Sequence, residues 1–563
     1  MAKPGLCSRC KGVNDKALPV PCTMLEGGPC SACEEREAIR EKIEQLEEEI
    51  IQLKAKHHAL GSRINEIHDP FVHKFPPEIG SHIFRLLLPT LYFGENHIWP
   101  EATTFLNLLR LGAVCRKWRE LAWATPDLWD TLYIRISQSM KRSVAKSLPC
   151  LLREWLSRSG IRPLTILFRH SGCYEESEDS PAYDDFSYES TAETLASVAD
   201  LVIEIINLHS GRWRNLHLVV GSDIPERLCG SVQSNQLRFL ELGINGGNSP
   251  TPKFVMKSKP FPTQLALTNC PPTTIDIGWD NITRAILCDL TADECLEVLE
   301  RAPLLKYLHS EFWDHSTINL STTILHRRLH SLNSSYSGTQ FLEAINVPSL
   351  EEWTHNTKGN PLPVTAMVSL LKRSGCCLKI LNLQNISAPP DDLSNLFQAM
   401  PSLERLRLHF WSVKNADGVM DNVFTRIFNS PSGNSTIASE DANRESFLPY
   451  LQLIECTTSC GTAPFSWSHI PQLYRQDHRR SLTLKSAAKE SHISDETALE
   501  LLKLADEGVD LQILDTTTRP REDFLKNFRK KVCSLSSTDS LQRKYFFSEY
   551  TVYPWYRLFR ISC

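Results

Sequence analysis

The sequence predicts an α/β protein in three parts: an N-terminal coiled-coil helix, a small helical module and an irregular α/β solenoid of leucine-based repeats. Apolar residues alternate at gaps of four and three over 39–67, which is the heptad pattern of a coiled coil. Two adjacent prolines then open a short apolar helical pattern, and the spacing L-x-x-L-x-L recurs in the carboxyl half. A chain of 563 residues with 41% hydrophobic residues can build several such folded units.

Composition narrows the classes of partner and compartment. Lys and Arg total 61 against 66 Asp and Glu, so the chain lacks the basic charge of dedicated nucleic-acid binders. No apolar leader follows Met1, and no run of about 18 apolar residues occurs. We therefore expect no membrane segment, a location in the cytoplasm, the nucleus or both, and cysteines that stay reduced.

Residues 1–33 form a cysteine-rich tail. It contains two C-x-x-C pairs, and four thiolates at such a spacing can surround one tetrahedral zinc ion in a zinc knuckle. The candidate zinc ligands are Cys7, Cys10, Cys30 and Cys33. A flexible tail is the alternative, because prolines and glycines surround these cysteines and Cys22 adds a fifth thiol. Zinc stays open on this basis, and the sequence predicts no other cofactor.

Residues 34–68 predict one helix with a coiled-coil seam. With Ile43 at position a, isoleucines fill most a positions and leucines fill the d positions, which favours a parallel two-stranded coil. Opposite charges in the flanking positions, such as Lys42 and Glu47, attract across such a pair. The seam predicts a homodimer through 39–67. The alternative is a single helix that lies on its own chain.

Residues 69–132 predict a small helical module. Pro76 and Pro77 suit the first turn of a helix, where a missing N–H is not needed, and Ile79 begins an apolar face at helical spacing. A second apolar stripe predicts another helix over 105–123. The module therefore presents two short amphipathic helices.

Several pieces of this module resemble one family, and they occur in the family's order. They are Phe-Pro-Pro-Glu-Ile at 75–79, Ile-Phe at 83–84, Val-Cys-Arg-Lys-Trp-Arg-Glu-Leu-Ala at 114–122 and Thr-Pro-Asp-Leu-Trp at 125–129. The stretch is similar to the F-box, especially in the large fungal F-box families, where a coil-like helix precedes the box and a leucine-rich region follows. Fungal members often carry an insertion like the one at 91–100.

The resemblance implies a three-helix module that docks onto a Skp-type adaptor, which in turn joins a cullin ubiquitin ligase. Docking of this kind needs apolar side chains that are presented at helical spacing and covered by the partner. The candidate adaptor-binding residues are Pro76, Pro77, Ile79, Ile83, Phe84, Val114, Cys115 and Trp118. For Ile83, Leu111 and Trp118 the alternative is that they fill the module's own core.

Residues 133–515 predict a leucine-rich-repeat-like solenoid. The clearest L-x-x-L-x-L triplets begin at Leu237, Leu378, Leu403 and Leu448. The second and third are 25 residues apart, within the range of leucine-rich repeats, and helical patterns such as 292–301 and 391–400 lie between copies. One strand and one helix per repeat would stack on their neighbours, with leucines in the core and polar strand residues facing a partner.

Loops and an end segment complete this region. Residues 174–193 carry eight acidic residues and no basic one, which indicates a solvated acidic loop, with recruitment of a basic partner as the alternative. A second loop is predicted at 430–443, which is rich in Ser and Asn. A last helix at 494–507 and a strand at 509–513 precede a C-terminal cap or tail over 516–563.

The motifs point to protein binding and away from catalysis. The sequence contains no nucleotide-binding, metalloprotease or serine-hydrolase motif, so we expect no enzyme and no catalytic residue. The leading hypothesis is an F-box substrate receptor that links an unknown target protein to an SCF-type ubiquitin ligase for degradation. Its rival is a leucine-rich interaction scaffold, a coiled-coil dimer without ligase association. A zinc-dependent nucleic-acid binder is a third hypothesis, which the near-even charge opposes.

Overall fold

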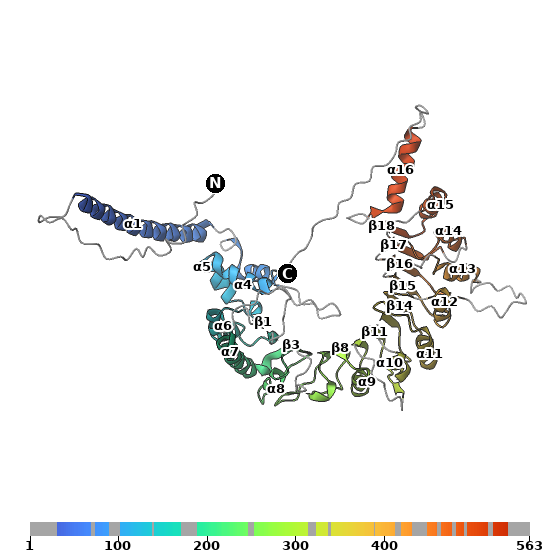
Figure 1. Cartoon of the computed structure of the whole chain (residues 1–563), viewed down its shortest axis with the longest axis horizontal. Helices are drawn as coiled ribbons and strands as arrows, with labels where there is room; N and C mark the ends of the chain where they lie inside the picture. The colour runs from blue at the N-terminus through green and yellow to red at the C-terminus, as the bar shows by residue number, and fades with distance from the viewer. Residues whose placement is uncertain are drawn as a thin grey trace, which may run out of the picture. The chain divides into compact units, whose positions relative to one another are not determined.

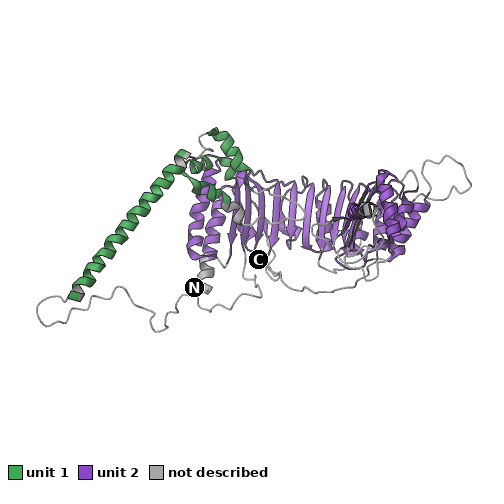
Figure 2. Cartoon of the chain, turned by 90° about the horizontal axis from the view of Figure 1, so that it is seen from above, with its two compact units in different colours: residues 1–92, 98–129 green, residues 93–97, 130–563 purple. Residues whose placement is uncertain are grey.

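The structure, a computed structural model, describes most of the chain as two compact units. The described residues are 31–68, 74–88, 102–137, 140–170, 188–245, 253–312, 323–335, 339–387, 389–410, 418–430, 447–458, 463–475, 480–488, 493–515 and 522–538. Unit 1 comprises Met1–Tyr92 and Ile98–Trp129, and unit 2 comprises Phe93–His97 and Asp130–Cys563 (Figure 2). The insertion at 91–100 lies outside the described residues.

Unit 1 begins with the long helix α1 (Ser31–His68). Its sequence is rich in Glu, Lys, Ile and Leu and carries a helical Arg40–Glu44 ion pair, which favour helix formation. Its apolar seam is exposed, with Ile43 at 51% and Leu53 at 57%. The long N-terminal helix is therefore confirmed. A stripe of this kind adds stability only when a second surface covers it.

The rest of unit 1 is a helical module. Its elements are α3 (Pro77–Arg85), α4 (Ala102–Val114), α5 (Arg116–Trp123) and the 3-10 helix η1 (Pro126–Leu128). The prediction of one helix over 105–123 is wrong, because the backbone is extended at Cys115 (φ −153°, ψ 172°). The Cys115 Sγ accepts a hydrogen bond from the Trp118 backbone N–H at 3.4 Å and so caps α5.

A small aromatic core joins these helices. The Phe84 and Trp118 rings pack with 5.1 Å between their centroids. Trp129 is buried, and its indole N–H donates to the Ala122 carbonyl at 2.7 Å. Because a buried indole N–H needs a partner, this bond fixes how the segment after α5 returns to the module.

The described residues of unit 2 form one 15-stranded sheet whose strands follow each other in chain order. Each strand is parallel to its neighbours except the last, which is antiparallel. The strands are β1 (Thr131–Ile136), β2 (Leu164–His170), β3 (Trp213–Val220), β4 (Phe239–Ile244), β6 (Gln264–Thr268), β8 (Arg284–Leu290), β9 (Tyr307–Phe312), β11 (Ser331–Ser335), β13 (Glu352–Asn356), β14 (Ile380–Gln384), β15 (Arg405–Phe410), β16 (Leu453–Thr458), β17 (Thr483–Ala488), β18 (Leu511–Asp515) and β19 (Glu522–Asp523).

The register of the sheet places the leucines of successive strands opposite each other. One such row runs through strands β3 to β17, and each of its side chains is at most 1% exposed. Its members are Leu216, Leu240, Leu265, Ala285, Leu308, Leu332, Trp353, Leu381, Leu406, Ile454 and Leu484. No single strand could bury such a residue alone, so each repeat is stabilised by its two neighbours.

The connections between strands run along the side of the sheet that carries the buried rows (Figure 1), and they contain all but the last of the helices described in unit 2. The described helices of unit 2 are α6 (Arg142–Arg158), α7 (Tyr188–Leu208), η2 (Ser210–Arg212), α8 (Ile224–Arg227), η3 (Pro272–Thr274), α9 (Ala292–Arg301), α10 (Thr339–Ala344), α11 (Val364–Ser374), α12 (Pro390–Gln398), α13 (Asp421–Asn429), α14 (His469–Leu473), α15 (Asp495–Asp506) and α16 (Phe524–Thr538). Two small parallel sheets also form there, β5 (Phe254–Val255) with β7 (Ile275–Asp276) and β10 (Ile324–Leu325) with β12 (Ile345–Asn346).

Three details differ from the expectations. The last triplet is displaced by three residues, because Leu451, Ile454 and Cys456, and not Leu448 and its successors, match the buried positions of β15. The expected acidic loop at 174–193 is wrong at its end, where α7 already begins at Tyr188. The segment over 516–563 includes the helix α16, which the sequence pattern did not predict. The loop at 430–443 lies outside the described residues apart from Ser430.

Candidate interaction surfaces

Helix α3 of the module divides its residues between a buried and an exposed side. Gly80 and Phe84, four residues apart, are buried. Ile79 is 45% exposed, and Leu86 and Leu87, which directly follow the helix, are 71% and 49% exposed. An apolar surface of this kind on a small module is typical of a docking site.

The structure places the eight predicted docking residues in different environments. Pro76, Pro77, Ile79 and Val114 are exposed, and Ile83, Cys115 and Trp118 are half-buried. Phe84 is 1% exposed, so its prediction as a surface docking residue is wrong: its ring fills the core against Trp118. Its neighbours Ile79 and Ile83, one helical turn apart, present the other side of the helix.

Sequence reasoning missed several exposed apolar residues of the same module. Phe75 is 48% exposed, Leu109 is 39% exposed, and Leu86 exceeds both. The run Leu86–Leu88 and the pair Leu108 and Leu109 were the available signals, because leucines that follow one another directly point in different directions and cannot all face one core.

The comparison with protein families agrees with this geometry. The F-box-like family matches residues 73–135, from the residues before α3 into strand β1. Residues 73–135 form an F-box-like domain. A search of curated proteins finds no match to the chain.

Two other expectations concern the N-terminal zinc ligands and membrane-spanning helices. Of the four candidate zinc ligands, Cys7, Cys10 and Cys30 lie outside the described residues, and Cys33 falls within the first turn of α1. None of the helices in the described part of the chain has both the length and the apolar character that crossing a membrane requires.

A second surface is formed by the strand residues that alternate with the buried rows, which we call the open face of the sheet. Two of its rows are largely polar between β13 and β17. They contain Thr354, Asn382, Arg407, Glu455 and Lys485 in the first row and Asn356, Gln384, His409 and Thr457 in the second. Amide, hydroxyl and charged groups at the strand spacing of about 4.8 Å can bind the polar groups of another protein.

The open face contains a shallow polar depression of about 390 Å³ over β14 to β16. Arg407 forms an ion pair with Glu455 there, with 3.2 Å between Nε and Oε2. Burial lowers the pKa of His409 on the same face, so this imidazole is neutral at neutral pH and can both donate and accept a hydrogen bond. The depression is suited to recognition by hydrogen bonds and charge.

The open face also brings together the one group of metal-ligating side chains found among the described residues: Cys288, His309 and Glu311. Burial, and next the charge of Glu311, raise the pKa of the Cys288 thiol to about 12. Burial and Glu311 also raise the pKa of the neighbouring Asp289. Sequence reasoning missed this group, because its members come from two strands and no short motif joins them.

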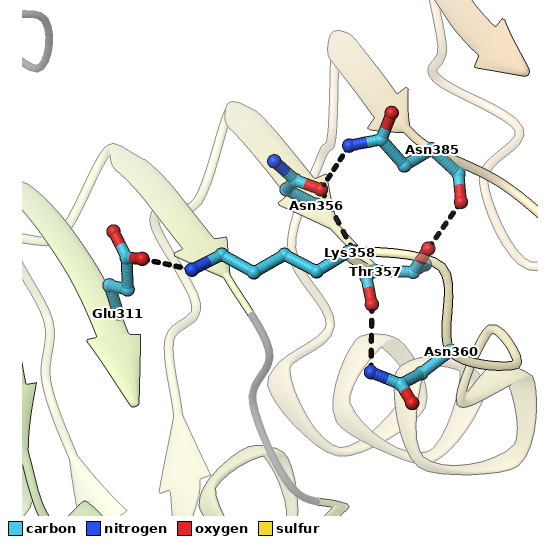
Figure 3. A network of polar contacts seen from close by, with 6 residues as sticks. All are labelled: Glu311, Asn356, Thr357, Lys358, Asn360 and Asn385. Atoms are coloured by element: carbon cyan, nitrogen blue, oxygen red, sulfur yellow. Dashed lines mark hydrogen bonds and ion pairs between the residues drawn. The ribbon is translucent and has the colours of Figure 1, made fainter. Parts of the chain in front are cut away.

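Lys358 reaches the same group from the loop after β13 (Figure 3). Its ammonium pairs with Glu311, and its backbone N–H donates to the Asn356 Oδ1 at 2.9 Å. The Asn385 side chain donates to the same Asn356 oxygen at 2.8 Å. The Asn360 side chain donates to the backbone carbonyl of Thr357 at 3.1 Å. This network holds Lys358, whose backbone is left-handed (φ 49°), beside Glu311 at the end of β9.

A buried polar patch lies behind the open face. The Ser334 hydroxyl is 2.8 Å from the His355 Nδ1 and accepts from the Trp353 indole N–H at 3.2 Å. Burial lowers the pKa of His355 to about 4, so its ring is neutral in the folded protein at neutral pH. These contacts satisfy buried polar groups inside a row that elsewhere holds leucines.

Proposed function

We propose that this chain is the substrate receptor of an SCF-type ubiquitin ligase that acts in the cytoplasm or nucleus. F-box domains generally bind Skp-type adaptors, and F-box proteins are typically non-catalytic, which supports the assignment of 73–135 to adaptor binding. A cullin ligase on the adaptor would then supply the chemistry. The receptor would act by holding its target at a high effective concentration near the ligase.

The observation that carries this proposal is the exposed apolar surface of the F-box-like domain. Ile79, Leu86 and Val114 are 45%, 71% and 48% exposed although the domain has its own filled core. Covering one such side chain completely is worth about 1.5–3 kcal/mol, so a few of them can provide the central contacts of an interface.

Binding of the purified full chain to a Skp-type adaptor tests the proposal. We expect the double substitution Ile79→Asp and Val114→Asp to weaken binding by at least about 100-fold, since each buried charge replaces a central contact worth about 2 kcal/mol. The matched control is Val144→Asp on α6, which is 51% exposed and lies outside the F-box-like domain. Undiminished binding by the double variant contradicts this surface, and failure of the unaltered chain to bind contradicts the proposal.

We also propose that 133–515 is a leucine-rich-repeat-like region that binds the target through the open face. Support comes from the repeated triplets, from one parallel strand per unit and from the contrast between buried leucine rows and polar open-face rows. Target specificity would then depend on residues such as Arg407 and His409, which alternate along β15 with buried residues and so are not part of the leucine rows.

The exposed seam of α1 favours a second candidate, a coiled-coil dimer that works as an interaction scaffold without a ligase. Its seam residues Ile43, Leu46 and Leu53 are each 45% exposed or more. Light scattering of the full chain distinguishes the states: Leu46→Asp with Leu53→Asp should convert a dimer to a monomer. Assembly that proceeds equally with and without a Skp-type adaptor would favour the scaffold.

A further inference from the structure

We propose that Cys288, His309 and Glu311 form a binding site for Zn²⁺ on the open face of the sheet. Cys288 on β8 and Glu311 on β9 are direct register partners, and His309 lies two residues before Glu311 and so on the same side. Their ligand atoms, a sulfur, an imidazole nitrogen and a carboxylate oxygen, all lie within 4.8 Å of one another. A site in the folded sheet is independent of whether the F-box-like domain binds an adaptor.

The ligand types select the metal class. Thiolate and imidazole together suit Zn²⁺ and disfavour Mg²⁺ and Ca²⁺, which prefer oxygen ligands. Three protein ligands are fewer than the four of a closed structural zinc site, so a fourth position remains for water or for a group of a bound protein. Because the ligands belong to hydrogen-bonded strands, the protein orients them before a metal arrives.

The charges around the site favour a cation. Asp289 follows Cys288 in a left-handed conformation, with φ 56°. The corresponding strand-end residues of β6 and β14, Asn269 and Asn385, have φ 51° and 57° but carry neutral amides. Asn269 and Asn385 each donate a side-chain hydrogen bond to a neighbouring strand, which a carboxylate at 289 cannot do. Asp289 thus places a carboxylate near Glu311 at a position where β6 and β14 have an amide.

Lys358 already supplies one positive charge to this group through its pair with Glu311 (Figure 3). An ammonium is a strongly hydrated point charge on a flexible stem, and it offers hydrogen-bond donors but cannot coordinate a sulfur and an imidazole nitrogen as a metal ion does. A divalent ion would bind all three ligands and would have to displace Lys358 from Glu311. Lys358 thus competes with the metal for Glu311, so removal of the Lys358 ammonium should tighten metal binding.

A Co²⁺ titration of the full chain tests the site, because cobalt bound to a thiolate shows a charge-transfer absorption that cobalt on oxygen or nitrogen ligands lacks. The chain used carries serine at the N-terminal cysteines, which would otherwise bind metal: Cys7, Cys10, Cys22, Cys30 and Cys33. We expect this band to appear with one equivalent of Co²⁺ and to disappear when Zn²⁺ is added, since zinc binds more tightly than cobalt to such ligands.

Single substitutions then identify the ligands. Cys288→Ser should abolish the band, and His309→Ala or Glu311→Gln should weaken Co²⁺ binding at least as much as loss of an outer-shell partner, about 10- to 100-fold. Cys377→Ser, at an exposed cysteine elsewhere, is the matched control and should leave the titration unchanged.

Lys358→Met should change the affinity for Co²⁺ in the opposite direction. We expect it to bind Co²⁺ up to about fivefold more tightly, the factor that a partly exposed ion pair represents. A misfolded chain could not produce tighter binding, so this variant keeps the test valid if a ligand substitution destabilises the sheet. The proposal is overturned if the unaltered sheet yields no charge-transfer band, or if Cys288→Ser retains it.

Discussion

The F-box-like domain and the repeat sheet use apolar residues in opposite ways. In the domain, Ile79 and Leu86 are 45% and 71% exposed, whereas Leu216 and Leu381 in the sheet are completely buried. The reason is the number of neighbours: a small module has few elements with which to cover its helices, while each inner strand of the sheet has a neighbour on both sides. The same residue type is therefore exposed in one region and buried in the core of the other.

Truncation of a core aromatic in each region gives the largest expected effect on stability. Trp353→Ala in the sheet and Phe84→Ala in the F-box-like domain should each lower the free energy of unfolding by about 3–5 kcal/mol, because both side chains are fully buried. Chemical unfolding measures the loss. Under the proposed function, only Phe84→Ala should also abolish adaptor binding. Loss of adaptor binding in Trp353→Ala would contradict the contrast between the F-box-like domain and the sheet, because it would show that the two regions unfold together.

Acid should destabilise the sheet next most strongly, through His355. Its folded pKa of about 4 lies below the unfolded value of about 6.5, so the unfolded chain binds more protons between these values. Stability is therefore full above about pH 6.5 and falls as the pH drops toward 4, by about 3 kcal/mol for this group. Unfolding of the unaltered chain and of His355→Gln should be compared across this window.

The two curves should converge as the pH falls, because glutamine does not titrate. His82→Gln on the exposed surface of the F-box-like domain serves as the control and should run parallel to the unaltered chain. A constant difference between the unaltered chain and His355→Gln at every pH would show that His355 does not carry the effect.

The smallest expected effect on stability comes from the open face. Arg407→Ala removes a partly exposed ion pair with Glu455, so the free energy of unfolding should change by less than about 1 kcal/mol. If the open face binds the target, the same variant should recover less of the target that the unaltered chain retains in a quantitative affinity purification. A large loss of stability with unchanged target recovery would assign Arg407 to the fold, and it would erase the distinction between core rows and open face.

Much of the secondary structure could be predicted from local pattern. The heptads over 39–67 correspond to α1, and helix α9 occupies the predicted 292–301. A capping box between Thr291 and Glu294, only three residues apart, fixes where that helix begins. Strands β1 to β3 were not predicted, since their apolar residues match the L-x-x-L-x-L spacing only loosely and precede its first clear copy at Leu237.

The interaction residues were less predictable than the elements that carry them. The resemblance to the F-box implied docking through α3, yet the apolar pattern of this helix could not show that Phe84 faces Trp118 while Ile79 stays exposed. Both positions fit an amphipathic helix, and only the packing partner distinguishes them. Cys115 likewise looked like one member of a continuous stripe and instead caps a new helix.

The amino-acid sequence by itself determined where helices such as α1, α9 and α15 and many of the strands lie, because periodicity, prolines and caps act over a few neighbouring residues. Only the tertiary structure decided which rows of side chains meet. Cys288, His309 and Glu311 come together because β8 and β9 pair in one register, and a shift of one residue would turn Glu311 to the opposite side of the sheet. Register depends on hydrogen bonds between strands and on the burial of every leucine row at once, so no local stretch of sequence specifies it.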